Sequence, residues 1–176
     1  LLAVGTQRRA NLRRDFATFT TTFPLARGIM SRARAQTKLE GAMLRCGLQG
    51  TRPRGPGRSL AAGEAIGATF PLTGEGIGKA METGALAAES LAQVLATGEA
   101  GALAAFEARL ERDIAPKYLG YTRAERWLEW PRIGDFVFRR AQRSPFLQQA
   151  ISGILDESVD PRTVFSAGGV FRSWFQ

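Results

Sequence analysis

The stretch Gly63–Gly84, GEAIGATFPLTGEGIGKAMETG, decides how the rest of this chain is interpreted. It starts with a glycine followed by an acid, continues through a loop around Pro71, and passes at Gly74 into a long helical pattern. The first N–H groups of a helix have no partner within the helix and carry a partial positive charge. Glycines at 74 and 76 let a ligand lie directly against the backbone. The stretch therefore predicts a binding site for a phosphate or for an electron-rich ring edge.

Two well-known phosphate-binding motifs do not fit this stretch. A P-loop requires glycine six residues before Lys79, where the chain has Thr73, and Ser or Thr directly after the lysine, where it has Ala80. The G-x-G-x-x-G dinucleotide loop fails because Lys79 lies three residues after Gly76. A glycine-rich turn that only precedes an ordinary helix remains open as the alternative.

The sequence after Gly74 predicts helices throughout. One apolar stripe runs through Ile77–Leu95 and ends at Gly98, and a second helical pattern covers Leu103–Ile114. Glu75 and Lys79 stand at the i, i+4 spacing of a stabilising ion pair. Further helix starts are predicted at Pro131, Pro145 and Pro161.

The sequence before the stretch predicts two helices and then two strands. Apolar spacing predicts a helix over residues 12–23 and a shorter one that starts at Pro24. Alternation over residues 39–49 predicts a half-buried strand, and the apolar run Ser59–Ala62 predicts a short buried one. Cys46 lies on the apolar side of the first strand and is interpreted as a small buried hydrophobe. Two strands do not make a sheet, so we expect any sheet to be completed by sequence outside this chain.

The composition excludes several classes of protein and of site. The 176 residues are 44% hydrophobic and 23% charged, which is typical of a globular protein. No apolar run is long enough for a membrane-spanning helix. A single cysteine excludes an internal disulfide framework, and the lack of histidine excludes His-based triads and leaves no metal site to expect. The chain starts at Leu1 without a secretion signal, so we expect a cytoplasmic protein of which this is one part.

The basic residues are concentrated in the first third of the chain. Residues 1–58 contain twelve Lys or Arg and two Asp or Glu, whereas residues 59–115 contain three and eight. The N-terminal group includes Arg8, Arg9, Arg13 and Arg14. Guanidinium groups suit phosphate oxygens, but no nucleic-acid-binding motif accompanies them, so nucleic acid is not the expected partner. A plain solvated face is the default interpretation, and the apolar Phe16, Phe19 and Phe23 beside these arginines favour peripheral contact with the cytoplasmic membrane over nucleic-acid binding.

Three pieces of the opening stretch resemble the second flavin-binding motif of group A FAD-dependent oxidoreductases, which are similar to aromatic hydroxylases in architecture. The pieces are Gly63-Glu-Ala-x-Gly67, Pro71-x-Thr-Gly-Glu-Gly-Ile77 and Ala80-x-x-Thr-Gly84. The Thr-Gly-Glu-Gly-Ile form is most similar to the geranylgeranyl reductase family. That family's first motif, an N-terminal G-x-G-x-x-G loop, is absent from this sequence. The resemblance therefore implies the C-terminal portion of such an enzyme.

The resemblance also implies which residues bind FAD: Gly63, Glu64, Gly67, Pro71, Thr73, Gly74, Glu75, Gly76 and Ile77. Gly63 and Glu64 would close on the ribityl and pyrophosphate groups, although the family has Asp where this chain has Glu64. The loop Gly74–Gly76 would face the pyrimidine edge of the isoalloxazine. The helix from Ile77 would direct its positive end at that edge and stabilise the anionic reduced flavin. No catalytic residue is identified, because the hydride chemistry belongs to the cofactor.

The predicted fold is a mostly helical α/β fragment, the C-terminal part of a Rossmann-like, aromatic-hydroxylase-type FAD fold. Residues 1–58 would end the substrate domain, 59–98 would hold the second FAD motif and its helix, and 99–176 would form a helical tail. The implied function is FAD-dependent reduction of C=C bonds in an isoprenoid or another apolar small molecule, completed by the missing N-terminal half. The alternatives are a monooxygenase or halogenase on the same scaffold, and a basic helical module that docks on membrane or nucleic acid.

Overall fold

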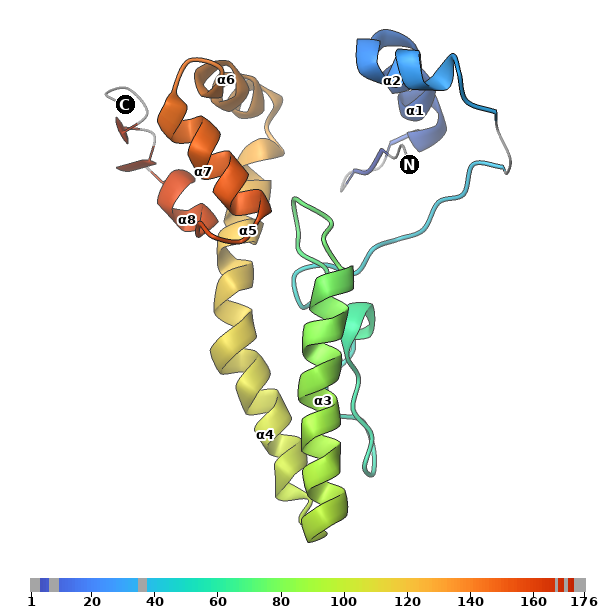
Figure 1. The fold of residues 1–176 in the computed structure, drawn as a ribbon, viewed down its shortest axis with the longest axis vertical. Coiled ribbons are helices and arrows are strands. Elements are labelled where there is room, and N and C mark those ends of the chain that lie inside the picture. Colours follow the sequence, from blue (N-terminus) through green and yellow to red (C-terminus); the bar gives the residue numbers. More distant parts are fainter. Residues whose placement is uncertain (1–3, 7–9, 35–37, 167, 170, 173–176) are drawn as a thin grey trace. The chain divides into compact units, whose positions relative to one another are not determined.

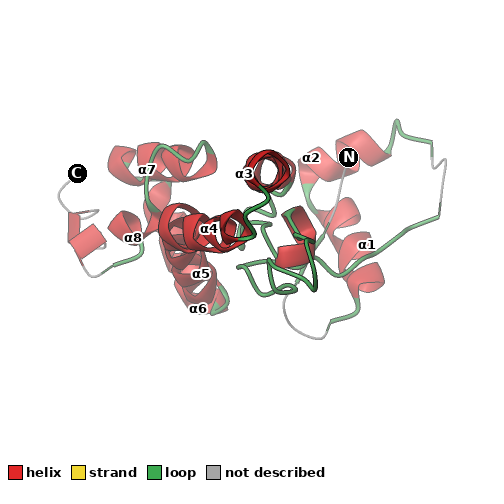
Figure 2. Cartoon of the chain, turned by 90° about the horizontal axis from the view of Figure 1, so that it is seen from below, coloured by secondary structure: helices red, strands yellow, loops and turns green. Residues whose placement is uncertain are grey.

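The computed structural model describes residues 4–6, 10–34, 38–166, 168–169 and 171–172, and within them the chain forms helices and no strand (Figures 1 and 2). The chain falls into two compact units, Leu1–Met43 and Leu44–Gln176. Among the described residues, no helix combines the length and the apolar character needed to cross a lipid bilayer.

The first unit is a pair of short helices, α1 (Leu12–Thr22) and α2 (Pro24–Met30), which confirms both helices predicted there. The Asn11 side chain starts α1 by accepting a hydrogen bond from the backbone N–H of Arg14 at 3.1 Å. The buried residues of the pair, Thr20 and Ala26, are small. Of its large apolar side chains, Phe16 and Phe19 are half-buried, and the exposed ones are Leu12, Phe23, Leu25, Ile29 and Met30.

The second unit contains the other helices of the described chain. They are η1 (a 3-10 turn, Gly63–Ile66), α3 (Ile77–Thr97), α4 (Gly101–Arg109), η2 (a π-helical turn, Leu110–Ile114), α5 (Ala115–Leu128), α6 (Pro131–Ala141), α7 (Pro145–Leu155) and α8 (Pro161–Val164). Proline at the first turn of α6, α7 and α8 confirms the three predicted helix starts.

Two long helical segments give this unit its frame. Helix α3 packs side by side with α4 through Val94, Ala102 and Leu103 (Figure 1). It ends as predicted at Gly98, whose φ of 74° is left-handed and whose N–H donates to the Val94 carbonyl at 2.8 Å. Helices α4 and α5 continue into each other through η2. Pro116 lies directly after this wider turn, where its missing N–H removes one helical hydrogen bond.

The predicted α/β fold is wrong for the described residues, which hold no sheet. The region 39–49, expected as a strand, contributes one isolated parallel bridge between Cys46 and Thr69. The expected strand Ser59–Ala62 contributes one isolated antiparallel bridge between Arg54 and Leu60. A Rossmann-like architecture requires a parallel sheet, so this part of the expectation is overturned as well.

Backbone conformation explains why neither segment becomes a strand. Directly after Cys46, Gly47 has a φ of 68° and Leu48 a φ of 58°, and left-handed backbone cannot continue an extended run. Hydrogen bonds still pair this segment with the glycine stretch, such as the one from Leu48 N–H to the Gly67 carbonyl at 2.8 Å. The second segment ends at once, because Gly63 has a φ of 64°. Burial does not follow the alternation in the sequence either, because residues 39–45 are all exposed and Cys46, Gly47 and Leu48 are all half-buried.

Candidate functional site

The glycine stretch consists of the turn η1, a loop, and the first part of α3. The turn η1 is docked on α3. The N–H of Gly63 donates to the Thr83 hydroxyl at 2.9 Å, and that hydroxyl donates to the Lys79 carbonyl at 2.7 Å. A Cβ at Gly63 would lie 3.1 Å from the Cβ of Ala80. Gly63 is therefore required both by its left-handed backbone and by close packing on α3.

Gly67 serves packing in the same way. Its φ is 78°, and a Cβ there would lie 2.7 Å from the backbone nitrogen of Gln49. Nearby on η1, Glu64 is exposed, and its carboxylate accepts a long hydrogen bond of 3.4 Å from the N–H of Arg45. In the described residues Glu64 thus contacts the segment before the stretch, on the side of η1.

The loop Phe70–Gly76 is a compact turn that leads into α3. Phe70 N–H donates to the Glu75 carbonyl at 2.8 Å, and Gly74 N–H donates to the Phe70 carbonyl at 3.1 Å. Pro71 is buried, and the Thr73 hydroxyl accepts from the N–H of Glu75 at 3.3 Å. Backbone bonds across the loop therefore fix its shape without a ligand.

The two glycines of this loop differ in what surrounds them. A Cβ at Gly74, whose φ is 69°, would have no atom within 4 Å. A Cβ at Gly76 would lie 2.8 Å from the Thr69 hydroxyl. Only Gly74 therefore lies against open space, as the sequence predicted for both; Gly76 is explained by packing on Thr69.

The N-terminus of α3 is capped by the chain's own carboxylate. Glu75 Oε1 accepts from the N–H of Gly78 at 2.8 Å, while its Oε2 is buried and has no hydrogen-bond partner among the described residues. Ile77, the first residue of α3, is exposed. A negative group that approaches this helix end meets free surface at Ile77, with the Glu75 carboxylate beside it.

The first residue of the loop, Phe70, packs on two aromatic rings of α5 that the sequence did not reveal. Phe70 is stacked on Tyr121 with ring centroids 4.2 Å apart, and Tyr118 meets it edge-on at 4.7 Å. The Tyr118 hydroxyl donates to the Ala68 carbonyl, and the Tyr121 hydroxyl donates to the Ile154 carbonyl at 2.7 Å. Burial is the main cause that raises the pKa of both tyrosines, so both remain hydrogen-bond donors at neutral pH.

Lys79 completes this support from α3. Its ammonium lies 4.7 Å from the centre of the Phe70 ring, 2.7 Å from Glu157 and 3.0 Å from Glu82. Burial lowers the pKa of Lys79, but the hydrogen bonds to Glu157 and Glu82 more than offset it, and the pKa is raised. The ion pair with Glu75 that the spacing suggested does not form, because Glu75 turns to cap α3 instead.

Glu125 on α5 also holds the loop, at Leu72. Its carboxylate accepts from the N–H of Leu72 at 3.2 Å. Burial, and to a lesser degree the charge of Glu129, raise the pKa of Glu125, and the bond from Leu72 opposes them. Cys46 lies in the same region, and burial together with Glu125 and Glu64 raises the pKa of its thiol, as befits an unreactive cysteine.

Glu125→Gln is expected to raise stability at neutral pH. An acid with a raised pKa in the folded state keeps its proton longer than in the unfolded chain, so stability falls as the pH rises above its ordinary value of 4.5. The amide retains an acceptor for Leu72 but does not ionise. In thermal melts from pH 4 to pH 8, the melting temperature of the variant relative to that of the wild type should increase with pH. An equal gain in Glu111→Gln, which changes an exposed acid of η2, would contradict this assignment.

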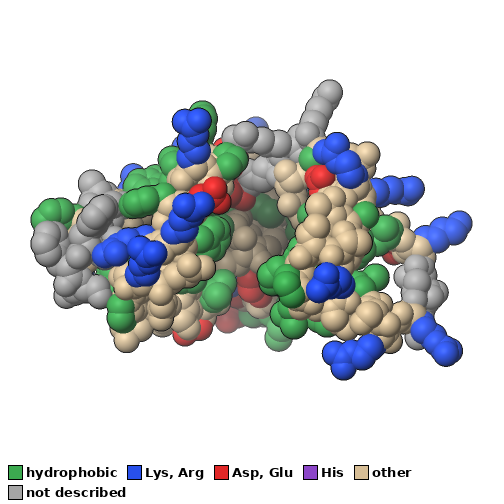
Figure 3. Space-filling view, turned by 90° about the horizontal axis from the view of Figure 1, so that it is seen from above, with side chains coloured by type: hydrophobic (Ala, Val, Ile, Leu, Met, Phe, Trp, Pro, Cys, Tyr) green, Lys and Arg blue, Asp and Glu red, His purple; other side chains and the backbone are tan. Residues whose placement is uncertain are grey.

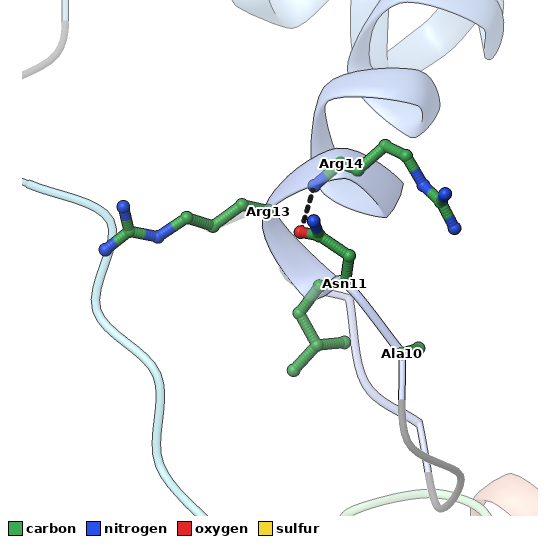
Figure 4. A pocket seen from close by; sticks show the side chains of 5 residues that line it. Ala10, Asn11, Arg13 and Arg14 are labelled. Atoms are coloured by element: carbon green, nitrogen blue, oxygen red, sulfur yellow. Dashed lines mark hydrogen bonds between the residues drawn. The ribbon is translucent and has the colours of Figure 1, made fainter.

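Two hollows among the described residues lie away from the glycine stretch. A wide, open one of about 750 Å³ is lined by Ala10–Arg14, where Arg13 and Arg14 point in different directions (Figure 4). Five consecutive residues at one helix end make a surface feature rather than a site. Arg8 and Arg9, expected in the same cluster, lie outside the described residues. A crevice of about 20 Å³ among Trp127, Val137 and Phe165 is too small for a flavin ring.

Comparisons of the chain with protein-family models, curated proteins and solved structures found no match. Nor do the described residues place three or more His, Cys, Asp or Glu side chains where they could hold one metal ion. A function for this chain has therefore to be inferred from the glycine stretch and its surroundings.

Proposed function

We propose that residues 63–77 form the flavin-facing part of an FAD site, in a reductase that acts on C=C bonds of an isoprenoid or similar apolar molecule. The motif likeness of the stretch supports this proposal. The observation that carries it is the position of Gly74, which has open space above it and lies three residues before the first residue of the 21-residue helix α3. A flat ring edge can approach such a backbone without meeting a side chain.

The chemistry that FAD would supply is hydride transfer, and the chain's part is to bind and polarise the ring. The start of α3 would face the pyrimidine edge with its N–H groups other than that of Gly78, which donates to Glu75, and their partial positive charge favours negative charge there. Phe70, Tyr121 and Lys79 would keep the loop in place while this charge develops. Since the sequence has no G-x-G-x-x-G loop, we propose that another part of the enzyme binds the adenosine half.

Gly74→Asn tests the site, with Gly98→Asn as its matched control. Both glycines have left-handed φ values, 69° and 74°, and a Cβ at either position would have no atom within 4 Å. Asn tolerates this conformation, so both variants carry a similar backbone cost. At Gly74 the new side chain would occupy the place of the ring and lower flavin affinity about tenfold or more. Gly98→Asn, at the far end of α3, should leave affinity unchanged.

The measurement is a titration of riboflavin or FAD followed by flavin fluorescence, with far-UV circular dichroism on the same samples. Riboflavin is included because it lacks the adenosine half that this chain has no motif to bind. Flavin binding that both variants weaken equally, or that neither weakens, would refute the placement of the ring at Gly74. No saturable binding of either flavin to the wild-type chain would refute a self-sufficient ring site.

A further inference from the structure

Helix α6 places its small residues inside and its large apolar residues outside. Its buried stripe consists of Gly134, Val137 and Ala141. The large apolar side chains of this segment are exposed: Trp130 by 61%, Ile133 by 38%, Phe136 by 43% and Phe138 by 60%. Ile133 and Phe136 are three residues apart and so share one face of the helix. That face is apolar without being part of the core.

Arginines flank these apolar residues on the outer side of the helix. Arg132 and Arg139 are seven residues apart on α6 and so lie along one line, Arg143 follows in the turn after the helix, and all three are exposed. From residue 130 to residue 143 the sequence has one acid, Asp135. Figure 3 shows basic side chains beside hydrophobic ones at the end of the second unit that carries α6, which Figure 1 labels.

We propose that this α6 surface, formed by Trp130, Ile133, Phe136, Arg132, Arg139 and Arg143, docks on an anionic lipid bilayer. Apolar side chains would enter the boundary between headgroups and acyl chains, while the arginines would bind lipid phosphates. An indole such as that of Trp130 suits this boundary, because it is apolar with one polar N–H. The proposal does not depend on the flavin site.

Charge decides between a bilayer and the other occupants of such a surface. A second copy of the chain would bring the arginine line of one molecule against that of the other, and like charges in contact oppose association. A nucleic acid would satisfy the arginines but leave Ile133 and Phe136 in water. An anionic bilayer matches both the charge and the apolar side chains of the surface.

The contact predicted from the sequence lay elsewhere, on the arginines and phenylalanines of the first unit. Arg13 and Arg14 are exposed at the start of α1, so that unit also offers basic charge. The two surfaces belong to different units, and substitutions can therefore separate them. The α6 surface is preferred because its arginines and apolar residues lie on one described helix and on the residues directly beside its two ends.

Co-sedimentation with vesicles tests the proposal on the full chain. Vesicles of phosphatidylcholine with phosphatidylglycerol are compared with pure phosphatidylcholine at low and high salt. Arg132→Glu with Arg139→Glu should lower partitioning onto the anionic vesicles about tenfold or more, since each basic residue near the surface contributes separately. The control, Arg52→Glu with Arg58→Glu, makes the same change in net charge on exposed loop residues.

A second pair of variants tests the apolar part. Trp130→Ser with Ile133→Ser should also weaken binding, whereas Leu95→Ser, on an exposed position of α3, should not. Binding to neither kind of vesicle would overturn the proposal. So would an equal loss of binding in the Arg132→Glu, Arg139→Glu variant and in its control, Arg52→Glu with Arg58→Glu. Loss through Arg13→Glu with Arg14→Glu alone would move the contact to the first unit. Tighter binding to DNA than to anionic vesicles at the same salt concentration would also overturn it.

Discussion

Phe70→Ala will lower the free energy of unfolding of the second unit by about 3–5 kcal/mol, the usual cost of removing a buried aromatic ring. Phe70 is 1% exposed and lies between Tyr121 on one side and the Lys79 ammonium on the other. The substitution removes the ring's burial and its contacts with both tyrosines, and it leaves a cavity directly under the loop. Urea denaturation followed by circular dichroism measures the loss.

The control for this prediction is Phe138→Ala, the same change at a residue that is 60% exposed. It should cost under about 1 kcal/mol, because surface substitutions away from special features have small effects. A comparable loss at both positions would mean that Phe70 does not anchor the loop. Phe70→Leu should fall between them, since it restores part of the volume but no ring.

Replacing Glu82 and Glu157 together by glutamine will cost about 3 kcal/mol, and Lys79→Met will cost less, although both remove the two ion pairs of Lys79. The difference follows from burial: the Lys79 side chain is 9% exposed, whereas each carboxylate is 34% exposed. Without the acids, an ammonium is left in an apolar environment beneath Phe70. Without the lysine, the two acids turn toward water, and Lys117 remains 3.6 Å from Glu82.

The Arg109–Glu89 pair provides the control for this asymmetry. Its atoms are also 2.7 Å apart, but its side chains are 36% and 61% exposed. Arg109→Met should therefore cost about 0.2–1 kcal/mol, as exposed ion pairs do. If the double glutamine variant costs no more than Lys79→Met, burial of the ammonium is not what makes this cluster important.

The parts of the fold that the sequence predicts well depend on neighbours in the chain. Helix starts at Pro131, Pro145 and Pro161 and the helix end at Gly98 follow from local backbone chemistry, and all four are confirmed. A strand depends on a partner that the sequence does not name. The alternation over residues 39–49 could not reveal that Leu48 has a left-handed φ.

In the candidate site, too, features that depend on nearby residues could be predicted, and features that depend on distant residues could not. The loop around Pro71 and the start of the long helix could be predicted, because glycine, proline and periodicity indicate them directly. The sequence could not show why each glycine is needed. A Cβ at Gly63, Gly67 or Gly76 would come too close to Ala80, Gln49 or Thr69, respectively. The supports were invisible too: Lys79 and Glu157 are 78 positions apart, and no local pattern connects them.

That distance along the chain has a consequence for synthesis and turnover. During translation the glycine loop and α3 are made long before residue 157. Lys79 can therefore form its ion pair with Glu157 only after the turn that follows α7 has been synthesised. A chain cut or terminated within α7 would keep the whole glycine stretch and lose Glu157. Such a product would hold an under-compensated ammonium beneath its loop, would open there more often, and would present that loop to proteases. Because of this ion pair, the stability of the loop depends on whether the distant C-terminal segment is present.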